Sequence, residues 1–258
     1  MDAIKELSER ELKDIAFVKD FPELIVLKDY RLTCALYLLC NIKNCYFKGG
    51  TALQKIFLNH SRLSEDIDYT VTKNLEAVKK EIIDTLDKSN LFTKLELDKN
   101  NDFFTRIICH YTTTKGVDDT IFIDLNKKAK IITPPEEHYI KHFYNENIPS
   151  FIINTLSEQE MIAEKVAAAV GRNKPRDHFD IYQIIKQGHL INYELVAKKC
   201  ENNTFDVVKM FNKAKRLKNR WDDDMHSLIN EPVSFQEVMQ VLAEHFDLKG
   251  AKEVIRIK

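Results

Sequence analysis

The spacing of apolar positions predicts a first half in which helices and short strands alternate. Apolar residues recur at helical intervals in three stretches, 4–18, 21–42 and 75–88. Short runs rich in β-branched and aromatic residues predict five strands, at 45–48, 66–72, 92–97, 103–111 and 120–125. One more helix is expected directly after the first strand, over 51–58. This half should therefore form a small mixed sheet with helices packed against it.

The second half follows Pro134-Pro135 and has a mostly helical pattern. The sequence SEQE at 157–160 fits a capping box, which predicts a helix that runs to about Val170. Further helices are expected over 176–186, 205–221 and 234–246. The expected fold class is α/β (α+β), with N-terminal helices. An α/β core is expected over 1–135, and a helical domain over 136–258 is expected to complete a cleft.

Composition and charge narrow the classes of protein that fit. The chain has 258 residues, of which 44% are hydrophobic and 31% charged, which is enough for one or two domains with real cores. The formal net charge of −1 gives no global basic field, so any nucleic acid would have to bind a local patch. The longest uncharged apolar run, 32–42, falls short of the roughly 20 residues of a membrane span.

The expected location is the cytoplasm. Charged residues at positions 2, 5 and 6 do not fit a secretory signal peptide. Five cysteines form no CxxC pair and have apolar neighbours, which favours reduced thiols in the core over disulfides or a structural zinc site.

A strand, a glycine turn and a helix start follow one another at the centre of the first half, in FKGGTALQKI at 47–56. Glycine lets the backbone approach a ligand closely, and the free amides at a helix start point toward an anion. Gly49 and Gly50 are therefore candidates to hold a phosphate.

Two carboxylates follow on the next predicted strand, in DIDYTV at 66–71. Residues i and i+2 of a strand share a face, so Asp66 and Asp68 should point the same way while Ile67 points into the core. Paired carboxylates on a rigid strand suit Mg²⁺, an ion that prefers oxygen ligands and usually also binds substrate phosphates.

This stretch resembles the polymerase-β-type nucleotidyltransferase superfamily, and more closely its AbiEii toxin branch. That branch has a signature of roughly GGT-A-L-x-K followed by R-x-S-x-D-I-D. The matching residues are Gly49, Gly50, Thr51, Ala52, Leu53, Lys55, Arg62, Ser64, Asp66, Ile67 and Asp68. The resemblance implies a Mg²⁺-dependent enzyme with a two-metal site and an NTP as substrate. It extends over roughly 45–225.

Asp124 is the expected third metal ligand. It lies in the apolar run TIFIDL, where an acid is costly unless it faces water or a metal. The resemblance also assigns it the role of general base on the acceptor hydroxyl. The alternative is an exposed acid on a half-buried strand.

Polar residues around the glycine turn are expected to bind the nucleotide: Lys48, Thr51, Lys55, Arg62 and Ser64. Thr51 can also cap the helix. A solvated helix face is the alternative for Lys55 and Arg62, and a simple turn is the alternative for Ser64.

A second cluster, EKVAAAVGRNKPRDHFD at 164–180, matches the second signature of the AbiEii branch. The matching residues are Glu164, Lys165, Arg172, Arg176, Asp177 and Asp180. Lys165 and Arg172 are seven residues apart and share a helix face. The resemblance makes Lys165 a catalytic cation that neutralises triphosphate charge, with the other cations and acids at the nucleotide. Ordinary surface charges are the alternative.

A run of cations that contains no acid spans 209–220. Lys209, Lys213, Arg216 and Arg220 would share one face of a continuous helix. This face could bind the phosphates of RNA, and a solvated face is the alternative.

The function that the sequence favours is transfer of an NMP from an NTP to an acceptor hydroxyl. The favoured acceptor is RNA, at the 3′ end of tRNA, because some members of the branch act there. The branch implies a toxin of a toxin–antitoxin or abortive-infection system, for which a cognate antitoxin is a possible partner. The short apolar run gives no reason to expect a membrane partner. Two alternatives are a catalytically silent nucleotide-binding or interaction module on the same fold, and transfer to a protein or small molecule.

Overall fold

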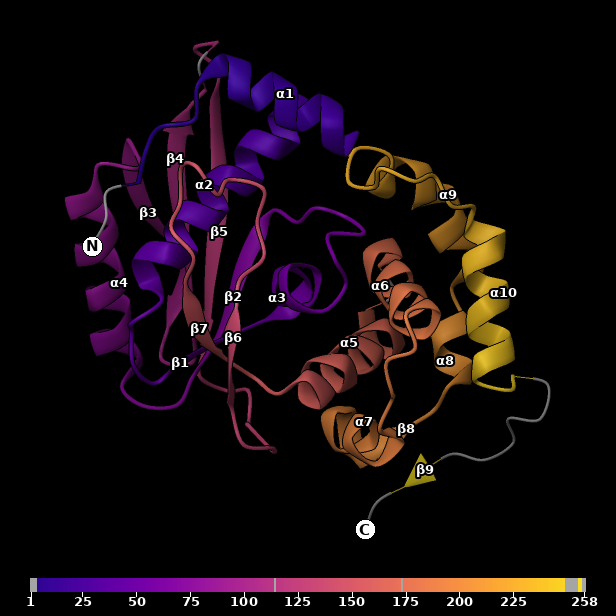
Figure 1. Ribbon diagram of the computed structural model, residues 1–258. Helices are drawn as coiled ribbons and strands as arrows, with labels where there is room; N and C mark the ends of the chain where they lie inside the picture. The colour runs from indigo at the N-terminus through magenta and orange to yellow at the C-terminus, as the bar shows by residue number, and fades with distance from the viewer. Residues whose placement is uncertain (1–3, 114, 173, 249–254, 257–258) are drawn as a thin grey trace. The chain divides into compact units, whose positions relative to one another are not determined.

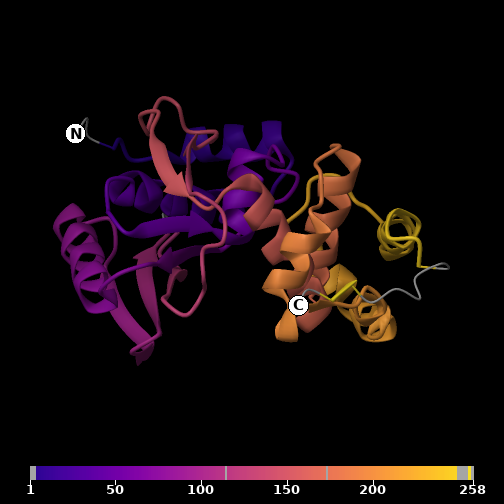
Figure 2. The same ribbon diagram turned by 90° about the horizontal axis from the view of Figure 1, so that it is seen from below.

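The structure is a computed structural model that describes residues 4–113, 115–172, 174–248 and 255–256. The chain divides into two compact units, Met1–Leu156 and Ser157–Lys258. Figure 1 shows the first unit in indigo to magenta and the second in orange to yellow. Figure 2 shows the same elements from below.

The first unit contains a mixed seven-stranded sheet in the order β3-β4-β5-β2-β1-β7-β6. Its strands are β1 (Cys45–Lys48), β2 (Asp66–Val71), β3 (Lys94–Asn101), β4 (Phe104–Thr112), β5 (Asp118–Asn126), β6 (Glu136–Tyr139) and β7 (Ile152–Thr155). Two pairings are parallel, β2 with β5 and β1 with β7, and the other four are antiparallel. The expected α/β class with a mixed sheet is confirmed.

Helices cover one face of this sheet. The helices of the unit are α1 (Glu9–Lys19), α2 (Glu23–Leu39), α3 (Gly49–Ile56) and α4 (Leu75–Ser89). Helix α2 contacts β2 and β5, and α4 contacts β3. The guanidinium carbon of Arg31 in α2 lies 5.8 Å from the ring centroid of Tyr111 on β4. The buried, helix-covered face therefore carries Tyr111 and, in register with its strand neighbours, Ile107, Ile123 and Ile67.

The opposite sheet face carries polar residues, because side chains alternate along a strand. Arg106 and His110 of β4 are half-buried there, whereas Ile107 and Cys109, which lie between them in the strand, are buried. The alternation seen in the sequence thus separates a core face from a face that is available for chemistry.

The second unit is mostly helical, as expected. Its helices are α5 (Glu158–Arg172), α6 (Pro175–Lys186), α7 (Tyr193–Lys199), α8 (Val208–Phe211), α9 (Ala214–Met225) and α10 (Phe235–His245), with a short 3₁₀ turn at Glu201–Asn203. A two-stranded sheet pairs β8 (Thr204–Phe205) with β9 (Ile255–Arg256). The Ser157 hydroxyl accepts a hydrogen bond from the amide of Glu160 at 3.2 Å, which caps the start of α5.

The single helix expected over 205–221 is wrong, because the segment breaks into β8, α8 and α9. Asn212 has low helix propensity, and cations four residues apart, such as Lys209 and Lys213, repel each other. The apolar stripe survives the break, because Met210 and Trp221 are still buried in the core of the unit.

The first unit ends at Leu156, whereas the sequence predicts a boundary near 135. Residues 136–155 supply β6 and β7, which extend the sheet beyond β1. Each strand has only four residues, so neither produces a clear apolar pattern.

Two expectations concern the cysteines and membrane-spanning helices. All five cysteines carry free thiols. Within the described residues, no helix is both long enough and apolar enough to cross a membrane.

Candidate functional site

The glycine turn sits against one of the two strand carboxylates. Strand β1 ends at Lys48, and α3 begins directly at Gly49 with a φ of +82°, a left-handed conformation. A Cβ atom on Gly49 would lie 2.9 Å from Cγ and 3.0 Å from Cβ of Asp68, and closer still to the Oδ2 oxygen. Both the backbone conformation and the close approach therefore require glycine at this position.

Asp66 and Asp68 share the half-buried face of β2, with Ile67 buried between them. Asp68 is in register with Lys48 on β1 and with Asp124 on β5. Asp124 is in register with Arg106 on β4. Paired residues on adjacent strands point to the same face, so one row of four charged side chains crosses the sheet. We call Lys48, Asp68, Asp124 and Arg106 the charged row.

Arg106 holds Asp124 in a bidentate ion pair. Its Nε donates to Oδ1 and its Nη2 to Oδ2, both at 2.7 Å. The side chains of Arg106 and Asp124 are 28% and 12% exposed, so the pair is largely shielded from water. The guanidinium carbon lies 5.0 Å from the ring centroid of Phe122 on β5. The hydrogen bonds with Asp124 raise the pKa of Arg106 above its ordinary value.

Sequence reasoning missed Arg106. Its only local signal is a cation at a polar position of an alternating strand, FTRIICHYT. The partnership with Asp124 depends on the register between β4 and β5, which the sequence alone does not reveal.

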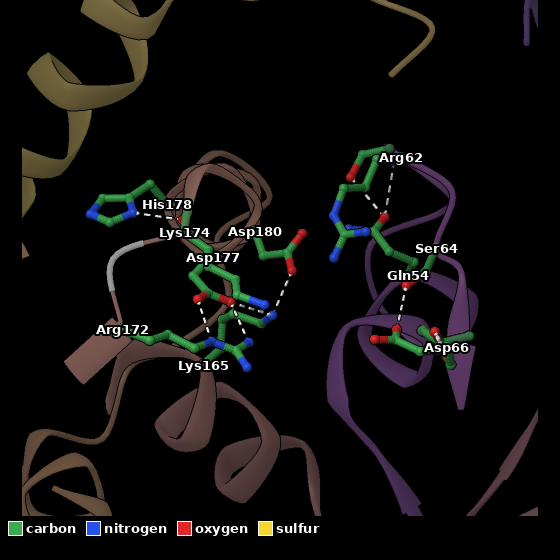
Figure 3. Close-up of polar contacts among 12 residues, drawn as sticks. Gln54, Arg62, Ser64, Asp66, Lys165, Arg172, Lys174, Asp177, His178 and Asp180 are labelled. Carbon is green, nitrogen blue, oxygen red and sulfur yellow. Dashed lines mark hydrogen bonds and ion pairs between the residues drawn. The ribbon is translucent and has the colours of Figure 1, made fainter. Parts of the chain in front are cut away.

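Two buried hydroxyls fix Asp66. The Thr51 hydroxyl, at the start of α3, donates a hydrogen bond to the backbone carbonyl of Asp66. The Ser64 hydroxyl donates to Oδ1 of Asp66 at 3.3 Å, as Figure 3 shows. These contacts tie the glycine-turn helix to the first carboxylate of β2. Thr51 and Ser64 therefore hold Asp66 in place within the candidate site.

Lys55 lies in the core of the first unit, away from the expected solvated or nucleotide-facing position. Its side chain is 1% exposed, and Nζ lies 2.7 Å from Oδ1 of Asp29 and 2.9 Å from the Thr33 hydroxyl. The Tyr144 hydroxyl donates to the same Asp29 carboxylate at 3.0 Å. These contacts cross-link α3 to α2, and we leave Lys55 out of the proposed nucleotide contacts.

Arg62 is also buried and braces the loop between α3 and β2. Its Nη1 donates to the carbonyl of Leu63 at 2.9 Å, and its amide donates to Gln54 Oε1 at 3.2 Å (Figure 3). Lys48, by contrast, is half-buried beside the glycine turn and stays in the candidate site.

The second cluster is a buried ion-pair network between α5 and α6 (Figure 3). Lys165 Nζ lies 3.1 Å from Oδ1 of Asp177 and 2.8 Å from Oδ2 of Asp180. Arg172 donates from Nε and Nη2 to the two oxygens of Asp177, both at 2.8 Å. Lys165, Asp177 and Asp180 are buried, whereas the Arg172 side chain is 55% exposed.

Charge balance in this network favours the ionised acids. Burial alone would raise the pKa of Asp177, but the charges and hydrogen bonds of Lys165 and Arg172 outweigh burial and lower it below its ordinary value. Arg176 is half-buried in the first turn of α6. Glu164 pairs with Lys199 of α7 at 2.8 Å, so it braces the helices.

Most of the basic run lines an open depression along one face of the start of α9. The depression has a volume of about 440 Å³, is open to solvent, and is lined by Asn212, Lys213, Lys215, Arg216, Asn219 and Arg220. We call these six residues the basic depression. Arg220 also pairs with Asp224, with Nη2 2.8 Å from Oδ2. Lys209 lies separately on α8.

The donor chemistry of Asp66 and Asp68 fits a divalent cation. Both are carboxylates on the same face of a rigid strand, beside a turn that leaves room for the Asp68 oxygen. Asp124 is adjacent in register, but Arg106 engages both of its oxygens. Within the described part of the chain, no three histidine, cysteine or acidic side chains already stand in ligating geometry.

Comparisons with known proteins give the family and similar folds. A family model described as "Nucleotidyl transferase AbiEii toxin, Type IV TA system" matches residues 41–248. No curated protein matches the chain.

Three solved structures are similar in fold. JHP933 from Helicobacter pylori is 18% identical, with a TM-score of 0.64 over 88% of this chain and 92% of that one. A putative nucleotidyltransferase from H. pylori is 17% identical, with a TM-score of 0.64 over 88% and 95%. MenT4, a nucleotidyltransferase toxin from Mycobacterium tuberculosis H37Rv, is 17% identical, with a TM-score of 0.69 over 96% and 91%.

Proposed function

Because the chain belongs to the AbiEii family of nucleotidyltransferase toxins of type IV toxin–antitoxin systems, we propose that it transfers an NMP to the 3′ end of tRNA. The family resemblance expected from the sequence is confirmed, and so is the enzyme class. The family implies an NTP substrate and a cognate antitoxin. Mg²⁺ dependence, the RNA acceptor and the roles of single residues are proposals.

One observation carries this proposal: the Asp68 carboxylate lies against Gly49, at the junction of β1 and α3. This junction brings the backbone of the glycine turn and the carboxylates of β2 to one place. A triphosphate bound at the turn would meet the start of α3, where free amides favour an anion. Lys48 beside the turn adds a positive charge for the phosphates.

Asp66 and Asp68 would hold Mg²⁺, with Asp124 as the third ligand. When bound, the ion would offset the negative charge of the triphosphate and of the departing pyrophosphate. The acceptor hydroxyl oxygen attacks the α-phosphorus, the bond from that phosphorus to the bridging oxygen breaks, and pyrophosphate leaves. Asp124 takes the hydroxyl proton, because Arg106 occupies only part of the acceptor capacity of its carboxylate.

The network in the second unit is proposed to bind nucleotide phosphate. Arg172 is clamped to Asp177 yet more than half exposed, so its guanidinium is oriented before a ligand arrives. Lys165 holds Asp177 from the buried side and is itself paired with Asp180. In this proposal Arg172 and Arg176 contact phosphate directly, and Lys165 supplies positive charge that stabilises the transition state.

The basic depression supports RNA as the acceptor. Lys213, Lys215 and Arg216 line it together with two asparagines, which can donate hydrogen bonds to phosphate and sugar oxygens. Arg220 keeps a carboxylate partner, which reduces its contribution.

A transfer assay tests the proposal. Purified protein is incubated with each α-labelled NTP, Mg²⁺ and total tRNA, and the RNA is resolved on a denaturing gel. We expect labelled tRNA with the wild type, and loss of the label with Asp66→Asn or Asp68→Asn.

Asp118→Asn is the matched control, because Asp118 is an exposed acid at the far end of β5 whose Oδ1 accepts from Thr112. It should transfer like the wild type. Full transfer by the Asp68→Asn variant would refute the metal role of the strand. Label on protein or on a small molecule, with unlabelled tRNA, would refute the RNA acceptor.

A further inference from the structure

Arg106 stands out among the charged groups of the open sheet face because no family signature in the sequence pointed to it. It engages both oxygens of the expected third metal ligand, at 2.7 Å each, in a largely shielded pair. On its other side Arg106 is in register with Asp98 of β3. The negative charge of Asp66 also helps to raise the pKa of Arg106. It is thus surrounded by carboxylates on one face of the sheet.

The balance of charge at this face is unequal. Four carboxylates, Asp66, Asp68, Asp98 and Asp124, lie beside two cations, Lys48 and Arg106, which leaves two excess negative charges. Like charges on neighbouring strands repel, so the acids need a cation nearby even when no metal is bound. Arg106 supplies that cation permanently, because it cannot lose its proton in a protein.

We propose that Arg106 is the resident counter-charge of the metal site, and that it makes retention of the divalent cation depend on the nucleotide. This proposal rests on the proposed function. With Arg106 in place, the acids that would hold a divalent ion are already partly neutralised, so the ion alone binds weakly. When NTP phosphates arrive with the ion, their negative charge restores the attraction, so ion and nucleotide bind together.

A merely structural pair would behave differently. If Arg106 only linked β4 to β5, its removal would lower stability and leave the affinity for a divalent ion unchanged or weaker. As a counter-charge, its removal should raise that affinity. The sign of the change in metal affinity therefore separates the two roles.

The experiment measures Mn²⁺ binding by calorimetry on the full chain, without nucleotide and with a non-hydrolysable NTP. The variants are Arg106→Gln, Arg106→Lys and Arg106→Gln combined with Asp68→Asn. Arg31→Gln is the matched control, because Arg31 also forms a two-pronged pair, with Glu6, but on helix α2. Removing a charge so close to the ion should raise the Mn²⁺ affinity of Arg106→Gln by at least about tenfold without nucleotide.

Arg106→Lys keeps the charge and should stay within about threefold of the wild type, as should Arg31→Gln. The tighter binding of Arg106→Gln should vanish when Asp68→Asn is added. In the wild type, the NTP analogue should itself tighten Mn²⁺ binding by at least about tenfold, a measurement that needs no variant to fold.

Unchanged or weaker Mn²⁺ binding by Arg106→Gln would overturn the counter-charge role. So would equal wild-type affinities with and without the NTP analogue, or a gain that persists in the double variant. None of these results would touch the proposed function, provided that Asp68→Asn still abolishes transfer to tRNA. If Asp68→Asn retained transfer, the proposed function would fail and this inference with it.

Discussion

Gly49→Ala is the sharpest test of the site, because two separate costs can be worked out from the structure. The left-handed φ of +82° costs an L-residue about 1–2 kcal/mol. The new methyl group would also press on the Asp68 carboxylate, and overpacking of this kind costs about 1–3 kcal/mol. The free energy of unfolding should therefore fall by about 2–5 kcal/mol.

Gly116→Ala isolates the first cost. Gly116 has a φ of +74° in the same unit, and an added Cβ would meet nothing within 4 Å. It should lose only about 1–2 kcal/mol. Combining Gly49→Ala with Asp68→Ala should remove the clash with the carboxylate group and leave only the Cβ of residue 68 at 3.0 Å, so the two changes should couple by about 1–3 kcal/mol.

The assay is urea unfolding followed by far-ultraviolet circular dichroism, alongside transfer to tRNA. The only tryptophan, Trp221, lies in the second unit, so its fluorescence reports that unit separately and should be unaffected. Transfer should fall about 100-fold or more, because a displaced Asp68 can no longer hold its ligand in place. Equal stability losses in Gly49→Ala and Gly116→Ala, with transfer retained in both, would refute the close-approach argument.

Three further predictions concern the second unit. Lys165→Ala should lower the free energy of unfolding, followed by Trp221 fluorescence, by about 3–5 kcal/mol, because it leaves two buried acids without their shared cation. Lys198→Ala, which breaks only an exposed pair, should cost about 0.5 kcal/mol or less. Asp177 has a lowered folded pKa, so its stabilising effect is present above the unfolded value of about 4 and is lost as pH falls below it. The unfolding free energy of Asp177→Asn should therefore decline less between about pH 5 and pH 2 than that of the wild type; an identical decline would contradict the shift. Reversing Lys213 and Arg216 to Glu should flatten the salt dependence of RNA binding, which has a log–log slope of about −0.7 per phosphate, in filter-binding titrations and leave NTP binding unchanged. Equal salt-dependence slopes in the wild type and the double variant would show that the basic depression does not bind RNA.

Local signals carried much of the fold. Strand β1 lies at the residues expected, and β2 differs only by one residue at its end. A short apolar run marks each strand, followed by glycine in β1 and interrupted by acids in β2. Such a signal needs only a few neighbouring residues of the sequence. Gly49 and the pair Asp66 and Asp68 are candidate site residues for the same reason, since their placement depends on a turn and on strand alternation.

Residues whose environment is set by tertiary packing could not be placed from the sequence. Lys55 lies on a helix near a presumed phosphate site, and nothing local shows that α2 presents Asp29 to it inside the core. The same holds for Arg106, whose partner is fixed by strand register. In the segment 205–221 the apolar spacing correctly predicts a buried stripe. The same apolar spacing does not reveal that the helix is interrupted between α8 and α9.

The clusters of charged side chains differ in whether acids and cations are equal in number. We use this difference to distinguish clusters that hold the fold together from the cluster that would bind a metal. Lys55 faces Asp29 one to one, and Lys165 and Arg172 face two buried acids, Asp177 and Asp180. Buried charge is costly unless it is matched, so such balanced groups can hold helices together without a ligand. The face with Asp66, Asp68 and Asp124 instead carries more acids than cations, on half-buried strands beside a glycine turn. The excess of acids leaves that face able to accept a further cation, which is why we place the metal chemistry there and expect the Lys165 network to contact the nucleotide through Arg172, its most exposed member.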